Sequence, residues 1–377
     1  MEFVSFVLIR KDNQMLDQAQ GNSPDIVIMD GSQASSFLRD TLTIGGTAIL
    51  RGETADDPGL GFAHSVASGL SMCPRRLESR YLYDRQGSAI FDRITEQPEY
   101  YLTRTEAGIL ADNACRIREI TGPVTLVELG SGYSLKTDHL LRAWLACAPS
   151  VRYIPVDVSE AALCEACRII CSLHLSARVI GVNGDYREAF PMLREVSPVM
   201  VVFLGSTIGN FEPEDESRFL AELASSLSPG DFFLLGVDLV KEQLIIESAY
   251  NDVAGVTADF TRNLFARMKR ELGSYIDLSV VEHVARYNPL RDQVDIHARF
   301  ARKQIVRVES LGKSFAIAEG EMVLTEISRK YHLEACVPSL EGFGFETEAV
   351  FTDERNWFAL ILLKRTDSLS ESRERRT

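Results

Sequence analysis

No stretch of this chain approaches the roughly 18 consecutive apolar residues that a membrane-spanning helix needs, so we expect no membrane span. Positive charge is also scarce. The formal net charge is −14 and no basic cluster stands out, which disfavours nucleic acid as a partner. No basic segment precedes the first apolar residues, as a signal peptide would require, and this favours a cytoplasmic location. The 377 residues are 45% hydrophobic and 25% charged, which is typical of a globular protein long enough for two domains, and we expect a monomer.

Cysteine is sparse, and its seven residues are odd in number, which fits reduced thiols better than a disulfide framework. Cys164, Cys167 and Cys171 would share one face of a helix, and His174 could complete a zinc site with them. Free cysteine is among the most buried residue types, so we favour packing of these thiols against a sheet. We therefore predict no metal.

Glycine is missing at one informative position. The letters VTLVELGSGY predict a strand over 124–129, a turn at Gly130 and Gly132, and a helix over 134–147. A dinucleotide-binding turn would have a third glycine where Leu135 stands, which disfavours a dehydrogenase. S-Adenosylmethionine has no phosphate and does not need that glycine. The turn therefore favours a ligand without a phosphate, such as this cofactor.

Asp157 follows the next apolar run, 151–156. It lies roughly 20 or slightly more residues beyond the glycines, where a ribose-binding carboxylate is expected. The alternative is that Asp157 simply caps a helix that begins near Ser159. The order of strand, glycine turn and acid favours the ribose role.

Apolar runs alternate with helical patterns through the middle of the chain. This alternation predicts a parallel sheet covered on both faces. The predicted strands lie at 124–129, 151–156, 178–182, 199–204 and 232–238.

The pattern changes after Lys241. We predict one long helix over 251–271 and an antiparallel insert over 279–309, where apolar and polar residues alternate. Two further strands, FETEAVFTD and NWFALILLK, could finish the sheet antiparallel. The first 70 or so residues show no strong periodicity, and the polar tail from Ser368 is predicted to be disordered.

Several segments resemble, in order and separation, the S-adenosylmethionine-dependent histidine Nα-methyltransferases of ergothioneine biosynthesis. The most specific are FLGSTIGNF and AYNDVAGVTADF, and ELGSG is common to many methyltransferases. The others are YDRQGSAIFDRITEQPEYYLTRTE, ELGSGYSLKT, PVDVS, NGDY, DLVK and LTEIS, across roughly 75–364.

The resemblance implies an α/β fold: a Rossmann-like class I methyltransferase with a second, substrate-binding domain that contains the antiparallel insert. The methyltransferase domain would comprise 105–239 and 330–366, and the substrate-binding domain 52–104 and 240–329. Residues 1–51 would be an N-terminal extension, which departs from the family, and 367–377 the tail.

For the substrate, the resemblance implies that Asn210 and Tyr250 hold the α-carboxylate, with Gly205 and Thr207 beside the amine. Asn210 could instead cap a helix near Pro213, and Tyr250 could be an ordinary aromatic at a helix boundary. Asn210, Thr207 and Tyr250 would orient the amine without a general base.

Glu326 and Ser328 share one face of an extended segment, and a carboxylate beside a hydroxyl can receive an imidazole. The resemblance implies this role, whereas an isolated Glu326 would be a surface charge. Ile296 stands where the family often has methionine near the ring, so tryptophan, tyrosine or a related amine remains an alternative substrate.

The resemblance places Tyr100 near the substrate and Tyr83 near the cofactor, although either could pack in the core. It assigns five further cofactor-binding residues, of which Lys136 could equally be solvated: Gly130, Lys136, Asp157, Asp185 and Tyr186. The implied activity is trimethylation of the α-nitrogen of L-histidine, a small-molecule substrate, to hercynine. A non-catalytic binding domain is the rival from another class.

Overall fold

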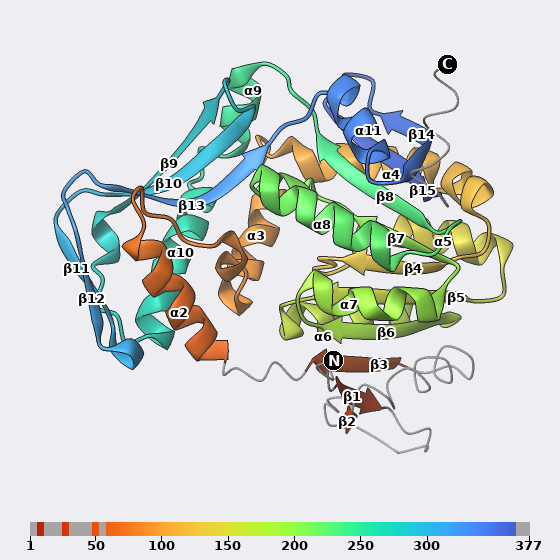
Figure 1. The fold of residues 1–377 in the computed structure, drawn as a ribbon, viewed down its shortest axis with the longest axis horizontal. Coiled ribbons are helices and arrows are strands. Elements are labelled where there is room, and N and C mark those ends of the chain that lie inside the picture. The colour runs from red at the N-terminus through yellow and green to blue at the C-terminus, as the bar shows by residue number, and fades with distance from the viewer. Residues whose placement is uncertain (1–5, 11–24, 30–46, 53–57, 367–377) are drawn as a thin grey trace.

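The structure is a computed structural model that describes residues 6–10, 25–29, 47–52 and 58–366 (Figure 1). The predicted tail from Ser368 lies outside the described residues, as does most of the N-terminal extension.

A large mixed sheet forms the centre of the molecule, with strand order β14-β15-β8-β7-β4-β5-β6-β3-β1-β2. The five strands predicted from the apolar runs pair in parallel, as expected. They are β4 (Thr125–Leu129), β5 (Val151–Asp157), β6 (Ala177–Asn183), β7 (Val199–Phe203) and β8 (Phe232–Asp238). The two last strands, β14 (Phe345–Thr352) and β15 (Phe358–Arg365), close this side antiparallel, which confirms the prediction.

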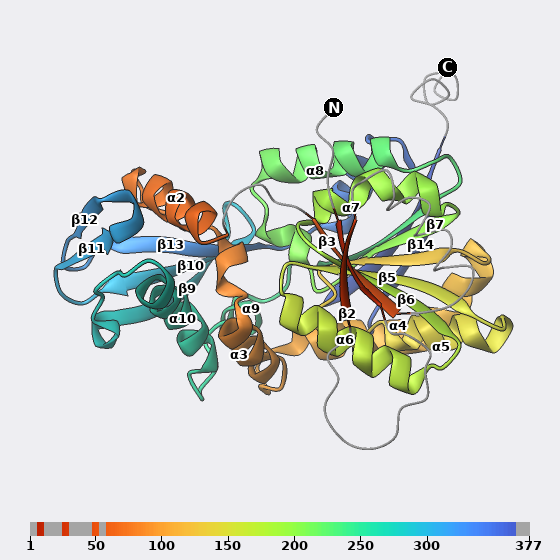
Figure 2. The ribbon, with the colours of Figure 1, turned by 90° about the horizontal axis from the view of Figure 1, so that it is seen from below.

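Helices cover both faces of the sheet (Figure 2). Successive residues of a strand point to opposite faces, so Leu126 packs in one buried cluster and Val127 in the other. Burial on both faces explains why these strands are continuous apolar runs. On one face lie α4 (Tyr101–Thr121), α5 (Asp138–Cys147) and α6 (Glu160–Leu173), and on the other α7 (Tyr186–Leu193), α8 (Pro213–Ser226) and α11 (Leu333–Glu341).

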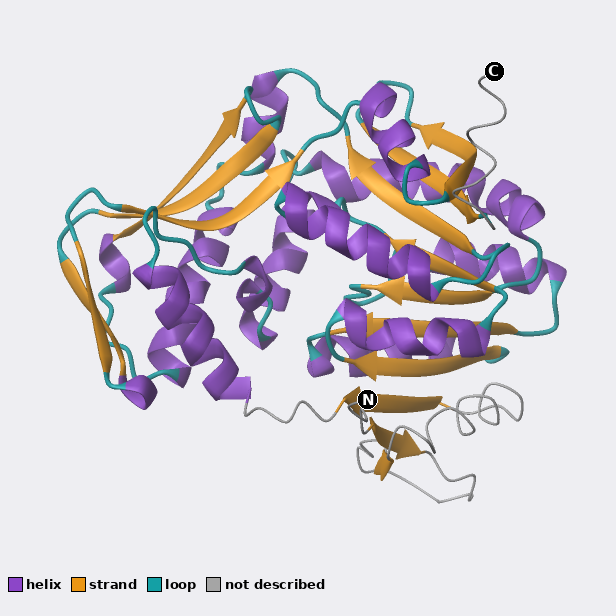
Figure 3. Ribbon diagram, in the orientation of Figure 1, coloured by secondary structure: helices purple, strands orange, loops and turns teal. Residues whose placement is uncertain are grey.

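A second group of elements extends from the end of β8 (Figure 3). The chain passes through α9 (Gln243–Ala249) and α10 (Val256–Glu271) into the predicted antiparallel insert. Its sheet has the order β13-β10-β9, formed by β9 (Val281–Asn288), β10 (Gln293–Phe300) and β13 (Met322–Arg329). A hairpin of β11 (Gln304–Val308) and β12 (Lys313–Ile317) lies beyond it.

Two earlier helices pack on this insert: α2 (Pro58–Ser71) contacts β11 and β12, and α3 (Arg85–Thr95) contacts α10. Short 3₁₀ helices complete the described elements. They are η1 (Ser79–Leu82), η2 (Arg194–Val196), η3 (Thr207–Asn210), η4 (Leu278–Val280) and η5 (Glu309–Leu311).

Two predicted helices begin later than expected. Gly130, Gly132 and Ser134 have positive φ angles, so the helix predicted from Ser134 starts at Asp138. The long helix predicted over 251–271 starts at Val256, because Gly255 before it has a φ of 73°.

The sequence pattern of the first 70 or so residues predicts no particular element, but the structure has several there. Besides α2, the structure has β1 (Phe6–Arg10), β2 (Asp25–Met29) and β3 (Thr47–Gly52). β3 pairs in parallel with β6, and β1 pairs antiparallel with both β3 and β2. These strands extend the sheet beyond β6.

No helix among the described residues is both long and apolar enough to span a membrane.

Candidate active site

The chain turns sharply where β4 ends. Gly130, Gly132 and Ser134 have positive φ angles of 69°, 50° and 56°. The amide of Gly130 donates to the carbonyl of Val156 at 2.8 Å, which ties the turn to β5. A Cβ on Gly130 would lie 3.3 Å from the phenol oxygen of Tyr186, so glycine permits this close approach.

Asp157 links the turn to the next helix. Its Oδ2 accepts a hydrogen bond from the amide of Gly132 at 2.8 Å, and its Oδ1 accepts one from the amide of Ser159, also at 2.8 Å. Burial raises the pKa of the Asp157 carboxyl, while these two amides lower it. The N-cap of α6 is Ser159, whose side chain accepts from the amide of Ala162. Asp157 is therefore not the helix cap that the alternative required.

Asp185 and Tyr186 follow the end of β6. The side chain of Asp185 caps α7 by accepting from the amide of Arg187 at 3.2 Å. The ring of Tyr186 packs edge-on against Phe203 of β7, with 5.2 Å between centroids. The pair thus lies beside the glycine turn, at the same edge of the sheet.

Lys136 pairs with a carboxylate that the sequence did not single out. Its ammonium contacts Glu106 of α4, whose side chain is fully buried. The same carboxylate accepts from the amide of Gly205 at 2.8 and 2.9 Å. Glu106 therefore joins the loop after β4 to the loop after β7.

The loop after β7 is strained at its start. Gly205 and Ser206 have φ angles of 76° and 55°, and the hydroxyl of Thr207 donates to the carbonyl of Leu204 at 2.9 Å. The chain then forms η3, which packs on β13 so closely that a Cβ on Gly209 would lie 2.8 Å from a backbone oxygen of that strand.

Asn210 reaches across to the insert. Its Nδ2 donates to Oε1 of Glu326 at 3.2 Å. The N-cap position of α8 belongs to Glu212, with Pro213 as the first helical residue, so Asn210 is not the cap of that helix.

Glu326 and Ser328 lie on one face of β13, as the sequence predicts. Burial raises the pKa of Glu326 to about 7, although Lys330 and the amide of Asn210 lower it. Ile296 of β10 is opposite Glu326 in the strand register and is only 2% exposed.

Tyr250 belongs to a buried polar network. Its hydroxyl lies 2.7 Å from Oγ of Ser328. The ammonium of Lys330 donates to both, at 2.8 Å to Tyr250 and 2.9 Å to Ser328, and forms an ion pair with Asp238 at 2.8 Å. Burial raises the pKa of the Tyr250 phenol, which therefore stays neutral.

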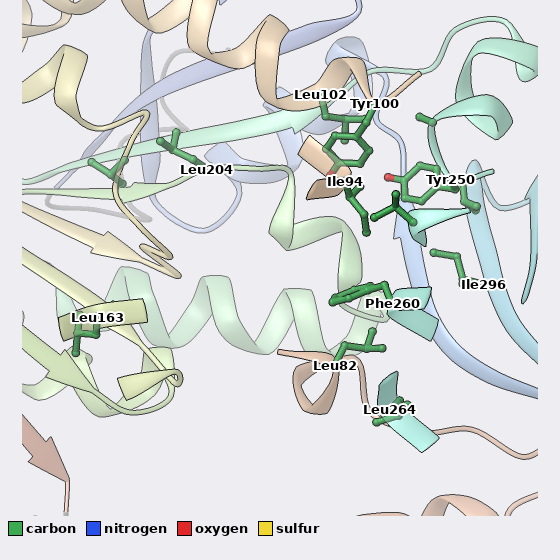
Figure 4. Close-up of a cluster of buried hydrophobic side chains, with 14 of the residues drawn as sticks. Leu82, Ile94, Tyr100, Leu102, Leu163, Leu204, Tyr250, Phe260, Leu264 and Ile296 are labelled. Atoms are coloured by element: carbon green, nitrogen blue, oxygen red, sulfur yellow. The ribbon is translucent and has the colours of Figure 1, made fainter. Parts of the chain in front are cut away.

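Aromatic rings pack beside this network, and Figure 4 shows Tyr100, Tyr250 and Phe260 among them. Tyr100 lies 6.3 Å from Tyr250, and Tyr83 lies 5.3 Å from Phe260, measured between ring centroids. Burial and the nearby Glu326 both raise the pKa values of Tyr83 and Tyr100. Tyr100 is thus buried in the core, the half-buried Tyr83 packs against it, and both lie within electrostatic range of the carboxylate.

Residues 62–365 match the family model of the histidine-specific, S-adenosylmethionine-dependent methyltransferases. The chain belongs to this family.

Three relatives of the methyltransferase illustrate the match. The chain is 41% identical over 311 residues to a histidine N-alpha-methyltransferase of Mycolicibacterium smegmatis, and the match covers 82% of this chain and 97% of the relative. It is 38% identical to a histidine N-alpha-methyltransferase of Mycobacterium tuberculosis, covering 80% of this chain and 94% of the relative. It is 31% identical to ergothioneine biosynthesis protein 1 of Neurospora crassa, covering 58% of this chain but 27% of that longer protein.

The family's dependence on S-adenosylmethionine confirms the cofactor that the missing third glycine favours. The turn of the methyltransferase also fits such a ligand. Gly130 brings bare backbone close to Tyr186, and the hydroxyl of Ser131 is buried with no hydrogen-bond partner in the described part of the chain. An unpartnered buried hydroxyl is unfavourable unless a ligand satisfies it.

The sequence did not reveal three buried charged groups of the methyltransferase: Glu106, Asp238 and Lys330. Lysine and glutamate are usually exposed, and nothing local marks them as partners. The one available signal was position, because Asp238 ends a predicted strand, as Asp157 does.

The cysteines of α6 behave as packing residues in the methyltransferase. Cys167 is buried in the core, and burial raises the pKa values of the Cys167 and Cys164 thiols, which disfavours the thiolate that zinc needs. His174 is paired with Asp138, with Nε2 and Oδ1 2.6 Å apart. No group of metal-binding side chains occurs among the described residues.

Proposed function

We propose that the protein transfers methyl groups from S-adenosylmethionine to the α-amino nitrogen of L-histidine, giving Nα,Nα,Nα-trimethylhistidine (hercynine) for ergothioneine biosynthesis. The observation that carries the proposal is the junction of Asn210 and Glu326. It joins the ligand-binding edge of the parallel sheet to a strand of the insert. An amino acid that spans this junction would have its two ends held by two parts of the chain, a methyltransferase domain (105–239 and 330–366) and a substrate-binding domain (52–104 and 240–329).

The imidazole would be held by Glu326 and Ser328. An ionised Glu326 would accept the N–H of a neutral ring, and this fixes the tautomer, so the other ring nitrogen is an acceptor for the hydroxyl of Ser328. Ile296 lies opposite Glu326 and would pack against the ring. Its volume is close to that of methionine, so it preserves an apolar wall.

The α-carboxylate would be held by the amide of Asn210 and the phenol of Tyr250, with the ring of Tyr100 beside them. Tyr250 supports this role because its burial keeps it a neutral hydrogen-bond donor. Gly205 and Thr207 would face the amine, because Glu106 links their loop to Lys136, which belongs to the proposed cofactor side of the site.

The cofactor would bind along the edge formed by β4, β5 and β6. Asp157 would hold the ribose, and Asp185 and Tyr186 would hold the adenine. Lys136 would contact the carboxylate of the cofactor. Gly130 would leave room for the ligand, and Tyr83 would cover it. Asp157 is suited to the role because it is already fixed by two backbone amides and needs no reorganisation.

S-Adenosylmethionine supplies an electrophilic methyl group, so the protein needs no covalent intermediate and no metal. Its task is to hold a neutral nitrogen about 3 to 3.5 Å from the methyl carbon, in line with the bond that breaks. Asn210, Thr207 and Tyr250 would orient the lone pair of that nitrogen. Exclusion of water next to a positive sulfonium favours the neutral amine over the ammonium form. Each round breaks the S–CH3 bond of the donor and releases S-adenosylhomocysteine, and the nitrogen gives up a proton before each attack, so three rounds complete the trimethylated product.

The test is to incubate the purified protein with S-adenosylmethionine and each common amino acid separately, and to follow the mass of the amino acid. We expect histidine to gain one, two and three methyl groups, and the other amino acids to gain none. Methylation of tryptophan or tyrosine in place of histidine would support the alternative substrate. Binding of histidine in a calorimeter without any mass gain would instead support a non-catalytic binding domain.

A further inference from the structure

Lys330 is a fully buried cation next to the proposed substrate site. It follows β13 directly, and its side chain is 0% exposed. Its ammonium contacts three oxygens: Oδ2 of Asp238 at 2.8 Å, the phenol of Tyr250 at 2.8 Å and Oγ of Ser328 at 2.9 Å. A lysine ammonium has three hydrogens and no acceptor, so all of its hydrogens are used.

These contacts fix the direction of the two hydroxyl groups. Because Tyr250 and Ser328 each accept a hydrogen from Lys330, their own hydrogens must point elsewhere. The two oxygens lie 2.7 Å apart, so in the free protein one hydroxyl donates to the other and a single hydrogen remains available. A substrate can take both hydrogens only if another group satisfies the two oxygens.

Lys330 is that group. When Tyr250 donates to the carboxylate of the substrate and Ser328 donates to the ring nitrogen, Lys330 still donates to both hydroxyl oxygens. Each oxygen therefore keeps a hydrogen-bond donor. The charge also suits this role, because a substrate carboxylate in a buried site needs a nearby cation. Asp238 does not fully neutralise the positive charge of Lys330, because the same carboxylate also pairs with Lys241 at 2.5 Å.

We propose that Lys330 is a positioning residue for the substrate: it makes Tyr250 and Ser328 donate to the carboxylate and the ring of the same amino acid. The proposal rests on the function proposed above and extends it to a residue that does not touch the reacting atoms.

The matched control is Lys241. It shares Asp238 with Lys330, and its other contacts are the phenol of Tyr101 at 2.7 Å and the carbonyl of Leu239 at 2.5 Å. A purely structural role, neutralising Asp238, would make Lys330→Met and Lys241→Met behave alike. In Lys330→Met, Asp238 keeps Lys241 and the phenol of Tyr101 as partners, so the carboxylate is not orphaned.

The experiment measures steady-state kinetics of the full chain and of both variants, with melting temperatures as a check on folding. We expect Lys330→Met to raise the KM for histidine about tenfold or more, and to change kcat and the KM for S-adenosylmethionine by less than about threefold. Lys241→Met should leave the KM for histidine within about twofold of the parent value.

An unchanged KM for histidine in Lys330→Met, or equal increases in both variants, would overturn the proposal. If Lys330→Met does not fold, Lys330→Gln replaces it, because a polar amide suits a buried site but is one bond shorter than the ammonium and uncharged, so it cannot donate to both oxygens as Lys330 does. It should then show the same selective rise in the KM for histidine, and a parent-like KM would equally overturn the proposal. Failure of the parent protein to methylate histidine would instead refute the proposed function.

Discussion

At the scale of single residues, the ionisation of Glu326 is the feature that a pH profile can test. Burial raises the pKa of this carboxyl to about 7, so it is mainly neutral below that pH and mainly a carboxylate above it. Only the carboxylate accepts the N–H of the ring without offering a hydrogen of its own. The contribution of Glu326 to histidine recognition should therefore grow as the pH rises.

Glu326→Gln removes this ionisation and keeps the shape. We expect the ratio of kcat/KM for histidine, parent over variant, to rise through a pH near 7 when it is followed from about pH 5.5 to about 8.5. Taking the ratio cancels the ionisation of the substrate amine, which is common to both proteins. A ratio that does not change with pH would contradict an ionised Glu326 at the ring.

The candidate site could be predicted from the sequence where a residue type and its position carry the chemistry. Asp157 at a strand end is such a case, whereas the roles of Glu326 and Ser328 came from the family resemblance. The structure brings Asp157 to the glycine turn and Glu326 to Asn210, and the roles of these residues toward ligands stay predictions. Lys330 and Glu106 could not be found in this way. Their importance comes from burial and from partners far along the chain, which a local pattern does not contain.

At the scale of elements, the turn after β4 allows a comparison of two glycines. Gly130 and Gly132 both have positive φ, so alanine at either should lower the free energy of unfolding by about 1 kcal/mol. Only at Gly130 would a Cβ meet Tyr186, at 3.3 Å, whereas a Cβ at Gly132 has nothing within 4 Å.

We therefore expect Gly130→Ala to raise the KM for S-adenosylmethionine several-fold more than Gly132→Ala does, at similar losses of stability. Denaturant unfolding gives the stability of each variant, and initial rates at varied S-adenosylmethionine give the KM. Equal KM values in the two variants would show that the approach of Tyr186 to the turn does not matter for the cofactor.

The prediction of helices and strands succeeded where apolar runs alternate with helical patterns over a long stretch. It failed where a few backbone angles set the boundary of an element. The five parallel strands are buried on both faces, so their sequences are uninterrupted apolar runs with little ambiguity. The start of α5 depends on the positive φ of Ser134, and serine as a residue type does not predict a positive φ. The strands β1, β2 and β3 are no shorter than β4 and β7, but their sequences lack the alternation with helical patterns that marked the other strands.

At the scale of the whole molecule, the chain leaves the parallel sheet for the insert and later returns to the sheet. It leaves the sheet after β8 and comes back through β13, whose end is tied to β8 by the bridge between Leu239 and Tyr331 (Figure 1). Glu326 and Asn210 meet because of this return. Under the proposed function, the imidazole would lie at the insert and the methyl donor at the sheet, with the α-nitrogen between them.

This arrangement predicts which nitrogen of histidine is methylated, and the position of the methyl groups in the product tests it most directly. S-Adenosylmethionine labelled with ¹³C at its methyl group and unlabelled histidine would be converted by the protein, and the product examined by NMR. The account predicts that every transferred methyl is attached to the α-nitrogen, in one resonance for the trimethylated product. A labelled methyl on a ring nitrogen would contradict it, because the ring would then face the donor.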